Sequence, residues 1–482
     1  EALINDSLAM DKFNMGCRFE SYLIHTLQGN TEAAAAAKAE MKALMRGAVH
    51  SYLEYAIDYA SAGMYEEAAQ LLSFVTEENE ATYPMVYYAL GYFASKMGKK
   101  DEALNLYKKA ETMCPDYCFP NKLEEVLMLN DAMSLNPEGA KAPYYLGNFH
   151  YAARIYDEAI ACWEKSASID DTYPTVLRNL SLAYYNKQHN PQKALATLEK
   201  AYNLDTTDAR ILMELDQLYK KLRYPHRQRL DFLEAHADVV EQRDDLCIER
   251  ITLYNQLGEY QKAYDLINSR KFHPWEGGEG KVTSQYLLCR VELAKIAIRE
   301  GRFADAVRLL KETEKYPDNL GEGKLSMAEE NDIHYWMGCA YEGLGEEALA
   351  KEYFTKATKG SAEPAIAFFY NDQQPDKIFY QGLAWRKLGE EDKARSRFNR
   401  LIKHGEKHLF DKVKIDYFAV SLPDLLIWDD DLNVRNQIHC NLVMGMGYLG
   451  LGDKEQARKF LSEVARLDIN HQAGKQLLEM CG

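Results

Sequence analysis

The feature of this sequence that most constrains its fold is a recurring pair of small residues, a glycine followed five residues later by an alanine. The pair occurs seven times along the chain: Gly63/Ala68, Gly98/Ala103, Gly258/Ala263, Gly301/Ala306, Gly345/Ala350, Gly389/Ala394 and Gly452/Ala457. Gly or Ala stands seven residues before six of these glycines, and a large apolar residue stands nine residues after every one. Small residues let two helices cross closely, and a glycine in the left-handed conformation ends the first helix. The pattern therefore predicts antiparallel helix pairs stacked into an array.

Two further units keep the pattern without the glycine between the helices. One carries Gly147, Ala159 and Trp163, and the other carries Ala194 and Leu198. These recurring positions resemble the tetratricopeptide repeat superfamily along nearly the whole chain. The resemblance implies an all-α solenoid of about ten antiparallel helix pairs, wound as a right-handed superhelix. It also implies a concave face that binds a protein or peptide.

A narrower resemblance rests on residues 144–163 and 270–282. Both stretches are similar to the repeat-bearing C-terminal half of large bacterial proteins, whose N-terminal half is a carbohydrate-related β-sandwich domain of unknown function. The resemblance implies that sugar chemistry belongs to an upstream domain, which this chain supports or recruits. Residues 1–11 agree with this, since they are expected to form the second helix of a pair whose first helix lies upstream.

Interruptions of the repeat spacing divide the chain into four predicted segments. Residues 1–142 begin with a half repeat and include an extra helix near residues 121–135, and residues 143–269 hold the central repeats. Residues 270–404 carry long loops between repeats, because three successive anchoring alanines there are 43 to 44 residues apart instead of about 34. Residues 405–482 hold an irregular segment, the last repeat and a polar capping helix.

The composition argues against some classes of partner and favours one type of compartment. The formal charge of −16 repels the phosphate backbone of nucleic acids, and no stretch reaches the 18 apolar residues of a membrane span. The nine cysteines are scattered and odd in number, as buried free thiols are, which favours a reducing compartment such as the cytoplasm. The chain lacks an initiator methionine, so any targeting signal is expected to lie upstream.

No catalytic residue, metal or cofactor is predicted, because each candidate site lacks a required part. His404 and His408 are four apart but do not follow the order of a zinc helix, and they fit a solvated helix end better. The alternation from Asp429 to Asn433 lacks the glycine and the closing glutamate of a calcium loop. Residues 277–281 lack the Ser or Thr of a phosphate loop, and Cys114 and Cys118 lack a second ligand pair.

Peptide-binding members of the superfamily hold a terminal carboxylate with Lys and Asn side chains on successive first helices. Asn148, Asn179 and Arg210 occupy three such positions, but Tyr144 replaces a Lys and Glu214 would repel a carboxylate. A purely structural role for the two asparagines is the alternative.

The long loops near residues 270–285, 315–331 and 360–376 are expected to lie side by side, because equivalent loops of a solenoid emerge on one edge. A composite docking surface there would use these residues: His273, Trp275, Glu279, Lys281, Glu322 and Lys324. The plain alternative is that the glycines of these loops only let a long connection turn.

The sequence thus predicts a non-catalytic scaffold that binds a protein partner, or its own upstream domain, on the concave face or on the long-loop edge. The alternative function is glycan binding by exposed aromatic residues, motivated by Trp275 and the 33 tyrosines.

Overall fold

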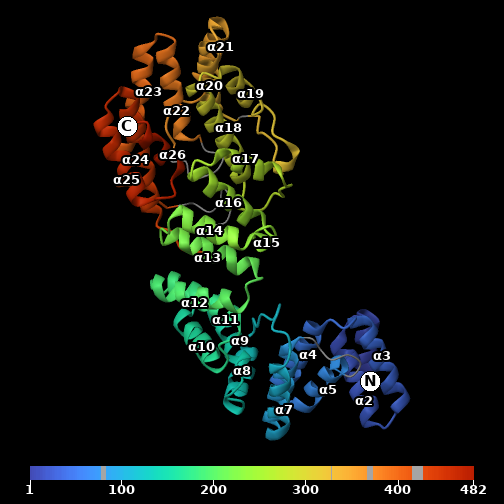
Figure 1. Ribbon diagram of the computed structural model, residues 1–482. Helices are drawn as coiled ribbons and strands as arrows, with labels where there is room; N and C mark the ends of the chain where they lie inside the picture. Colours follow the sequence, from blue (N-terminus) through green and yellow to red (C-terminus); the bar gives the residue numbers. More distant parts are fainter. Residues whose placement is uncertain (77–82, 327, 366–372, 415–426) are drawn as a thin grey trace. The chain divides into compact units, whose positions relative to one another are not determined.

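The computed structural model describes residues 1–76, 83–326, 328–365, 373–414 and 427–482. These residues form 26 α-helices and one short 3-10 helix, η1 (Asp318–Leu320), and no β-strand is found among them. The predicted all-helical repeat architecture is confirmed (Figure 1). The helices form two compact units, residues 1–204 and residues 205–482. Among the described residues, none of the helices combines the length and hydropathy that crossing a membrane requires.

The first unit consists of antiparallel pairs preceded by one single helix and interrupted by another. Its helices are α1 (Ala2–Met10), α2 (Met15–Leu27), α3 (Thr31–Met45), α4 (Val49–Ser61), α5 (Tyr65–Thr76), α6 (Pro84–Lys96), α7 (Lys100–Glu111), α8 (Leu123–Leu135), α9 (Lys141–Ala152), α10 (Tyr156–Ile169), α11 (Pro174–Asn186) and α12 (Pro191–Leu204). Helix α8 is the extra helix that the sequence predicts, and it packs between α6 and α9.

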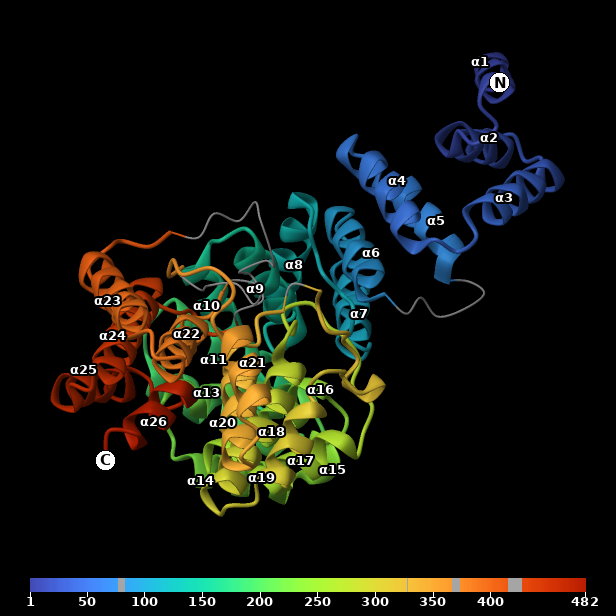
Figure 2. The ribbon, with the colours of Figure 1, turned by 90° about the horizontal axis from the view of Figure 1, so that it is seen from above.

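The second unit opens with the degenerate repeat and ends with a short helix, α26, at the place of the predicted capping helix. Its helices are α13 (Ala209–Lys221), α14 (His226–Ala235), α15 (Ala237–Val240), α16 (Asp244–Gln256), α17 (Tyr260–Asn268), α18 (Lys281–Arg299), α19 (Phe303–Lys311), α20 (Asn331–Gly343), α21 (Glu347–Ala357), α22 (Pro375–Lys387), α23 (Glu391–His408), α24 (Leu432–Leu451), α25 (Lys454–Leu467) and α26 (Gln472–Glu479). Figure 2 shows the successive pairs α16–α17, α18–α19 and α20–α21 stacked next to one another, in agreement with their contacts.

The glycine pattern has the two physical causes that the sequence predicts. All seven glycines that separate paired helices are left-handed, with φ between 73° and 86°. The small residues of the first helices pack directly against large side chains of the second helices. A β-carbon added to any of five glycines would come closer than 3.0 Å to the side chain 16 residues later; these are Gly91, Gly147, Gly338, Gly382 and Gly445. Only glycine permits that approach.

Two irregular regions extend beyond what the structure describes. Residues 415–426, in the predicted irregular segment, and residues 366–372, in the third long loop, lie outside the described residues, as does residue 327 in the second loop. The division at residues 142, 269 and 404 and the right-handed winding stay predictions.

The described parts of the long loops lie side by side, as expected. Asn319 joins the first two loops, because its carbonyl accepts a hydrogen bond from Phe272 N at 2.7 Å and its Nδ2 donates to Arg270 O at 3.0 Å. Glu329 of the second loop lies against Gly360 of the third. The second unit also curls back on itself, since residues 466–476 contact α13, α14, α16 and α18.

Candidate binding site on the inner face of the second unit

The inner face of the second unit is the surface that the first helices of its pairs, α13, α16, α18, α20, α22 and α24, present toward the inside of the curl. The side chains there are polar and aromatic. Trp336 Nε1 donates to the Tyr380 hydroxyl at 3.2 Å, and Lys377 Nζ lies 2.5 Å from Asp332 and 3.2 Å from Asp376. These contacts join the first helices α20 and α22 of two neighbouring pairs.

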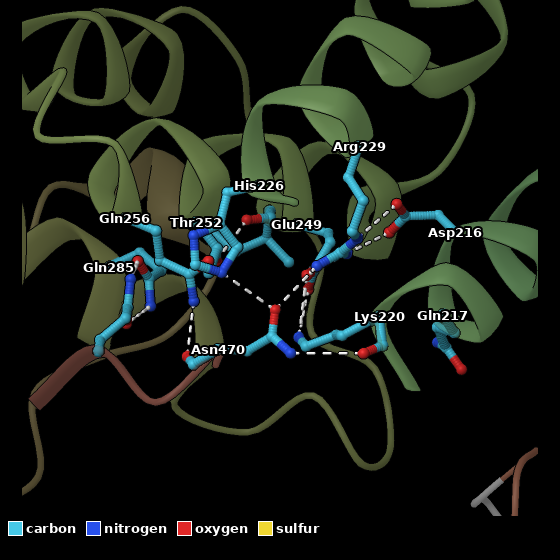
Figure 3. Close-up of polar contacts among 12 residues, drawn as sticks. Asp216, Gln217, Lys220, His226, Arg229, Glu249, Thr252, Gln256, Gln285 and Asn470 are labelled. Atoms are coloured by element: carbon cyan, nitrogen blue, oxygen red, sulfur yellow. Dashed lines mark hydrogen bonds and ion pairs between the residues drawn. The ribbon is translucent and has the colours of Figure 1, made fainter. Parts of the chain in front are cut away.

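A buried ion cluster forms one end of the inner face (Figure 3). The side chain of Arg229, from α14, has no exposed surface. It binds Asp216 through two hydrogen bonds of 3.0 and 2.7 Å and donates to Glu249 at 2.7 Å. Lys220 donates to both oxygens of Glu249 at 2.9 and 3.0 Å. Two positive and two negative groups therefore balance one another, and Arg229 and Asp216 among them are fully buried, where an unpaired charge would be costly.

The cluster sets the charge state of its members. Burial by itself would raise the pKa of Glu249, but the positive charges of Lys220 and Arg229 outweigh burial and hold that pKa well below its usual range. Burial and the nearby charges of Arg229 and Lys475 lower the pKa of His226. Glu249 is thus ionised and His226 neutral at pH 7.

The C-terminal turn places Asn470 on this cluster. Asn470 Oδ1 lies 3.3 Å from Arg229 Nη1 and 3.2 Å from His226 Nε2, and Asn470 Nδ2 donates to the carbonyl of Lys220 at 3.4 Å. A guanidinium can only donate, so the oxygen of the Asn470 amide must face Arg229. His226 must then carry its hydrogen on Nε2, which agrees with a neutral imidazole.

Further hydrogen bonds continue from Asn470 toward α26. Gln256 Nε2 donates to the carbonyl of Asn470 at 2.6 Å, and Lys475 Nζ donates to the carbonyl of Gln256 at 2.5 Å. The side-chain amides of Gln285 and Gln472 exchange two hydrogen bonds of 3.0 and 3.1 Å. Next to the turn, Arg223 donates to the carbonyl of Arg466. We call these contacts of residues 466–476 with α13, α14, α16 and α18 the polar clasp.

A pocket of about 280 Å³ lies between the C-terminal turn, the start of α22 and α24. Its wall is apolar where Ile438, Leu442 and Met446 line it. Its rim is polar, formed by these residues: Gln374, Asp376, Arg435, His439, Asp468 and His471. Burial and the positive charge of nearby His404 lower the pKa of His439 to about 4, so its imidazole is neutral at pH 7. An apolar wall with a polar rim suits a side chain of another polypeptide.

The predicted carboxylate clamp is divided between the two units. Asn148 and Asn179 belong to the first unit, where Asn179 Nδ2 donates to Asn148 Oδ1 at 3.2 Å. Asn148 also accepts a hydrogen bond from Trp163 Nε1 at 3.1 Å. Arg210 belongs to the second unit and pairs with Glu214 at 3.1 Å. Each residue thus has a structural partner, and the clamp stays a prediction.

The residues predicted for the loop surface mostly contact the loops themselves. Trp275 is half-buried and packs over Gly278, where any β-carbon would collide with its ring. Both carboxylate oxygens of Glu322 accept from Gly280 N, at 3.2 and 3.0 Å. Lys324 pairs with Glu330 at 2.5 Å. Glu322 therefore joins the first loop to the second, whereas Lys324 makes its contact within the second loop.

The remaining loop residues lie at the ends of the first loop. His273 is exposed, and its main-chain N donates to Asp244 at 2.8 Å. Glu279 is half-buried, and Lys281 is the first residue of α18. Burial and the positive charge of Lys220 lower the pKa of Lys281, which places this lysine near the ion cluster.

The other candidates behave as ordinary side chains. The rings of His404 and His408 are 4.6 Å apart, but no group of three or more metal-binding side chains occurs in the described part of the chain. Cys118 is buried, and burial raises the pKa of its thiol to about 12, which is the opposite of what a reactive thiolate needs.

Sequence reasoning did not identify the ion cluster or Asn470. A signal was present in the degenerate repeat, where Asp216 stands among apolar residues and, like Arg229, is buried. A buried pair of opposite charges that breaks an apolar pattern is a candidate for a specific contact. Nothing in the sequence near Asn470 marks it as the partner.

Three segments of the chain match models of a known repeat family. Residues 86–117 and 332–359 match one model and residues 378–404 match another, and both models are described as tetratricopeptide repeat. The matched segments cover the pairs α6–α7, α20–α21 and α22–α23.

Solved structures with similarity to the chain include those of YrrB, PilF and MamA. YrrB, described as a TPR protein with an unusual peptide-binding site, is 18% identical with a TM-score of 0.20, over 43% of this chain and 95% of YrrB. PilF of Pseudomonas aeruginosa is 19% identical with a TM-score of 0.27, over 46% of this chain and 90% of PilF. MamA of Desulfovibrio magneticus RS-1 is 16% identical with a TM-score of 0.23, over 41% of this chain and 97% of that one. These matches carry neither a partner nor a site over to this chain.

Proposed function

We propose, from the premise that this chain is a tetratricopeptide repeat protein, that it is a scaffold whose second unit binds another protein on its inner face. Repeats of this kind generally mediate protein–protein interactions. The observation that supports the proposal is that the inner face already binds polypeptide: it holds the turn at residues 466–476 through main-chain and side-chain hydrogen bonds.

The chemistry of the inner face indicates what kind of partner segment fits. Charged pairs such as Lys377 with Asp332 alternate with the aromatic side chains of Trp336 and Tyr380. Such a surface recognises an irregular or extended segment by hydrogen bonds, and the pocket at Ile438 accepts one anchoring side chain. The carboxylates of Asp376 and Asp468 at its rim favour an anchor with a positively charged end.

The first test changes the wall of the pocket. Ile438 is half-buried, so Ile438→Arg should fill the pocket and present a positive charge to the partner while leaving the helix intact. We expect the affinity for a partner, identified by photo-crosslinking from position 438, to fall about tenfold or more. Titration of the purified partner into the full chain measures the change.

The matched control is Leu349→Arg, which adds the same charge at an exposed position of α21, in the second helix of its pair. This control should bind the partner as the wild-type chain does. Equal affinity of the Ile438→Arg variant and the wild-type chain would contradict the proposed site.

The long-loop edge is a second candidate surface for the same scaffold function. The adjacency of the first two loops supports it, because hydrogen bonds join them to one another. Trp275 exposes part of its ring there and is its only large aromatic candidate from the sequence prediction.

A Trp275→Ala variant tests the loop surface and the glycan-binding alternative together. If the loops bind a protein, the variant should lose about tenfold in affinity for the partner and nothing in thermal stability. Saturable binding on a glycan array that disappears in the variant would instead support glycan binding. Unchanged partner affinity and no sugar response would remove the loop edge as a binding surface.

A further inference from the structure

The polar clasp joins parts of the second unit that are far apart in sequence, and the contacts that define it are hydrogen bonds. The apolar side chains that follow this segment pack elsewhere: Leu477 and Cys481 belong to the hydrophobic cluster that Leu461 and Val464 of α25 also form. Detaching the clasp from α13–α18 would thus leave that cluster intact.

The groups around Asn470 match both ends of a carboxamide. Arg229 and His226 can only donate toward its oxygen, in the protonation states derived above, and the Lys220 carbonyl can only accept from its nitrogen. A carboxylate in this place would set an oxygen against the Lys220 carbonyl. An alkyl side chain would leave Arg229 Nη1 and His226 Nε2 without this partner.

We propose that His226, Arg229, Gln256 and the Lys220 carbonyl form a carboxamide-reading site for a polypeptide turn, which the chain's own Asn470 occupies and which a partner segment bearing an asparagine competes for. The main-chain contact from Gln256 to residue 470 fixes the backbone beside the amide, so the site recognises a peptide and not a free amide. Lys475 adds a contact five residues downstream of the asparagine. The competition by a partner segment rests on the proposed function, whereas the binding of Asn470 in the site does not.

Two other contacts help to close the curl without touching the carboxamide site. Lys221 of α13 pairs with Asp430 at 2.8 Å, and the Trp428 indole donates to the carbonyl of Glu214 at 3.1 Å. The site can therefore open at Asn470 while the unit keeps its fold.

The test uses a labelled synthetic peptide with the sequence of residues 464–482 and the full-length chain. In the wild-type chain the tethered Asn470 competes at a high effective concentration, so the peptide should bind poorly. In an Asn470→Ala chain the peptide should bind at least about tenfold more tightly than to the wild-type chain. A peptide in which the asparagine is replaced by Asp should bind about tenfold more weakly than the Asn peptide, and an Ala peptide more weakly still.

Circular dichroism shows whether each variant is folded. If Asn470→Ala does not fold, a Gln472→Ala chain decides, because it removes only the contact to Gln285 and should also bind the peptide more tightly than the wild-type chain does. Absence of peptide binding to a folded variant, equal binding to the variant and the wild-type chain, or equal binding of the Asn, Asp and Ala peptides would each overturn the proposal. The experiment needs no partner protein, so its failure is distinct from failure of the scaffold function, which the Ile438→Arg variant tests.

Discussion

Replacing Arg229 by methionine is expected to lower the free energy of unfolding of the second unit by about 3–5 kcal/mol. Methionine fills a similar volume but cannot pair with a carboxylate. The buried carboxylate of Asp216 then loses its partner, and Glu249 loses one of its two partners. Urea unfolding measures the loss, and hydrogen exchange of α14 and α16 amides locates it in this unit. Arg227→Met is the matched control, because Arg227 lies on the same helix with an exposed side chain and should leave the unfolding midpoint nearly unchanged.

The loss in the Arg229→Met variant should depend on pH. The folded pKa of Glu249 is depressed in the wild-type chain, so its stabilisation is present above the unfolded pKa of about 4.3 and is lost as the pH falls toward the folded pKa. In the variant, the unpaired buried carboxylates can take up protons instead. The difference between the two proteins should therefore be largest at neutral pH and shrink below about pH 5. A difference that stays constant or grows on acidification would show that lost packing, not charge, causes the loss.

Replacing Trp163 by alanine is expected to destabilise the first unit by about 3–5 kcal/mol. The indole packs directly over Gly147 of the paired helix, and its Nε1 donates to the carbonyl of Tyr144 and to Asn148 at 3.2 and 3.1 Å. The substitution removes a large apolar side chain and leaves Asn148 without this hydrogen bond. Urea unfolding combined with hydrogen exchange of α9 and α10 measures the effect, and Lys165→Ala, exposed on the same helix, is the control.

A double variant tests whether the glycine and the indole share one space. Gly147→Leu alone should cost about 1–3 kcal/mol, because a β-carbon there collides with Trp163. In the double variant Gly147→Leu/Trp163→Ala, the leucine occupies the volume that the indole leaves empty. The loss in free energy of unfolding should therefore be clearly smaller than the sum of the losses in the two single variants. Additive costs would contradict the contact.

Several features of this fold could be predicted from the sequence because they depend on neighbouring helices only. The left-handed glycines such as Gly345 and Gly389, the close approach of Gly382 to Phe398, and the extra helix α8 all follow from short-range patterns. The loop residue Trp275 was a different case. Its sequence position suggested an exposed anchor, but Gly278 lets the indole pack on the loop itself.

What the sequence by itself determined is the helix pair and the way one pair packs on the next, since each repeat contacts only its neighbours and its small and large residues encode that contact. Only the tertiary structure decided that Asn470 meets Arg229, 241 positions away along the chain. The closure of the second unit depends on small rotations between successive pairs, which add up over the whole unit. The long loops and the degenerate repeat at residues 208–242 contribute to that sum, and no single residue pattern records it.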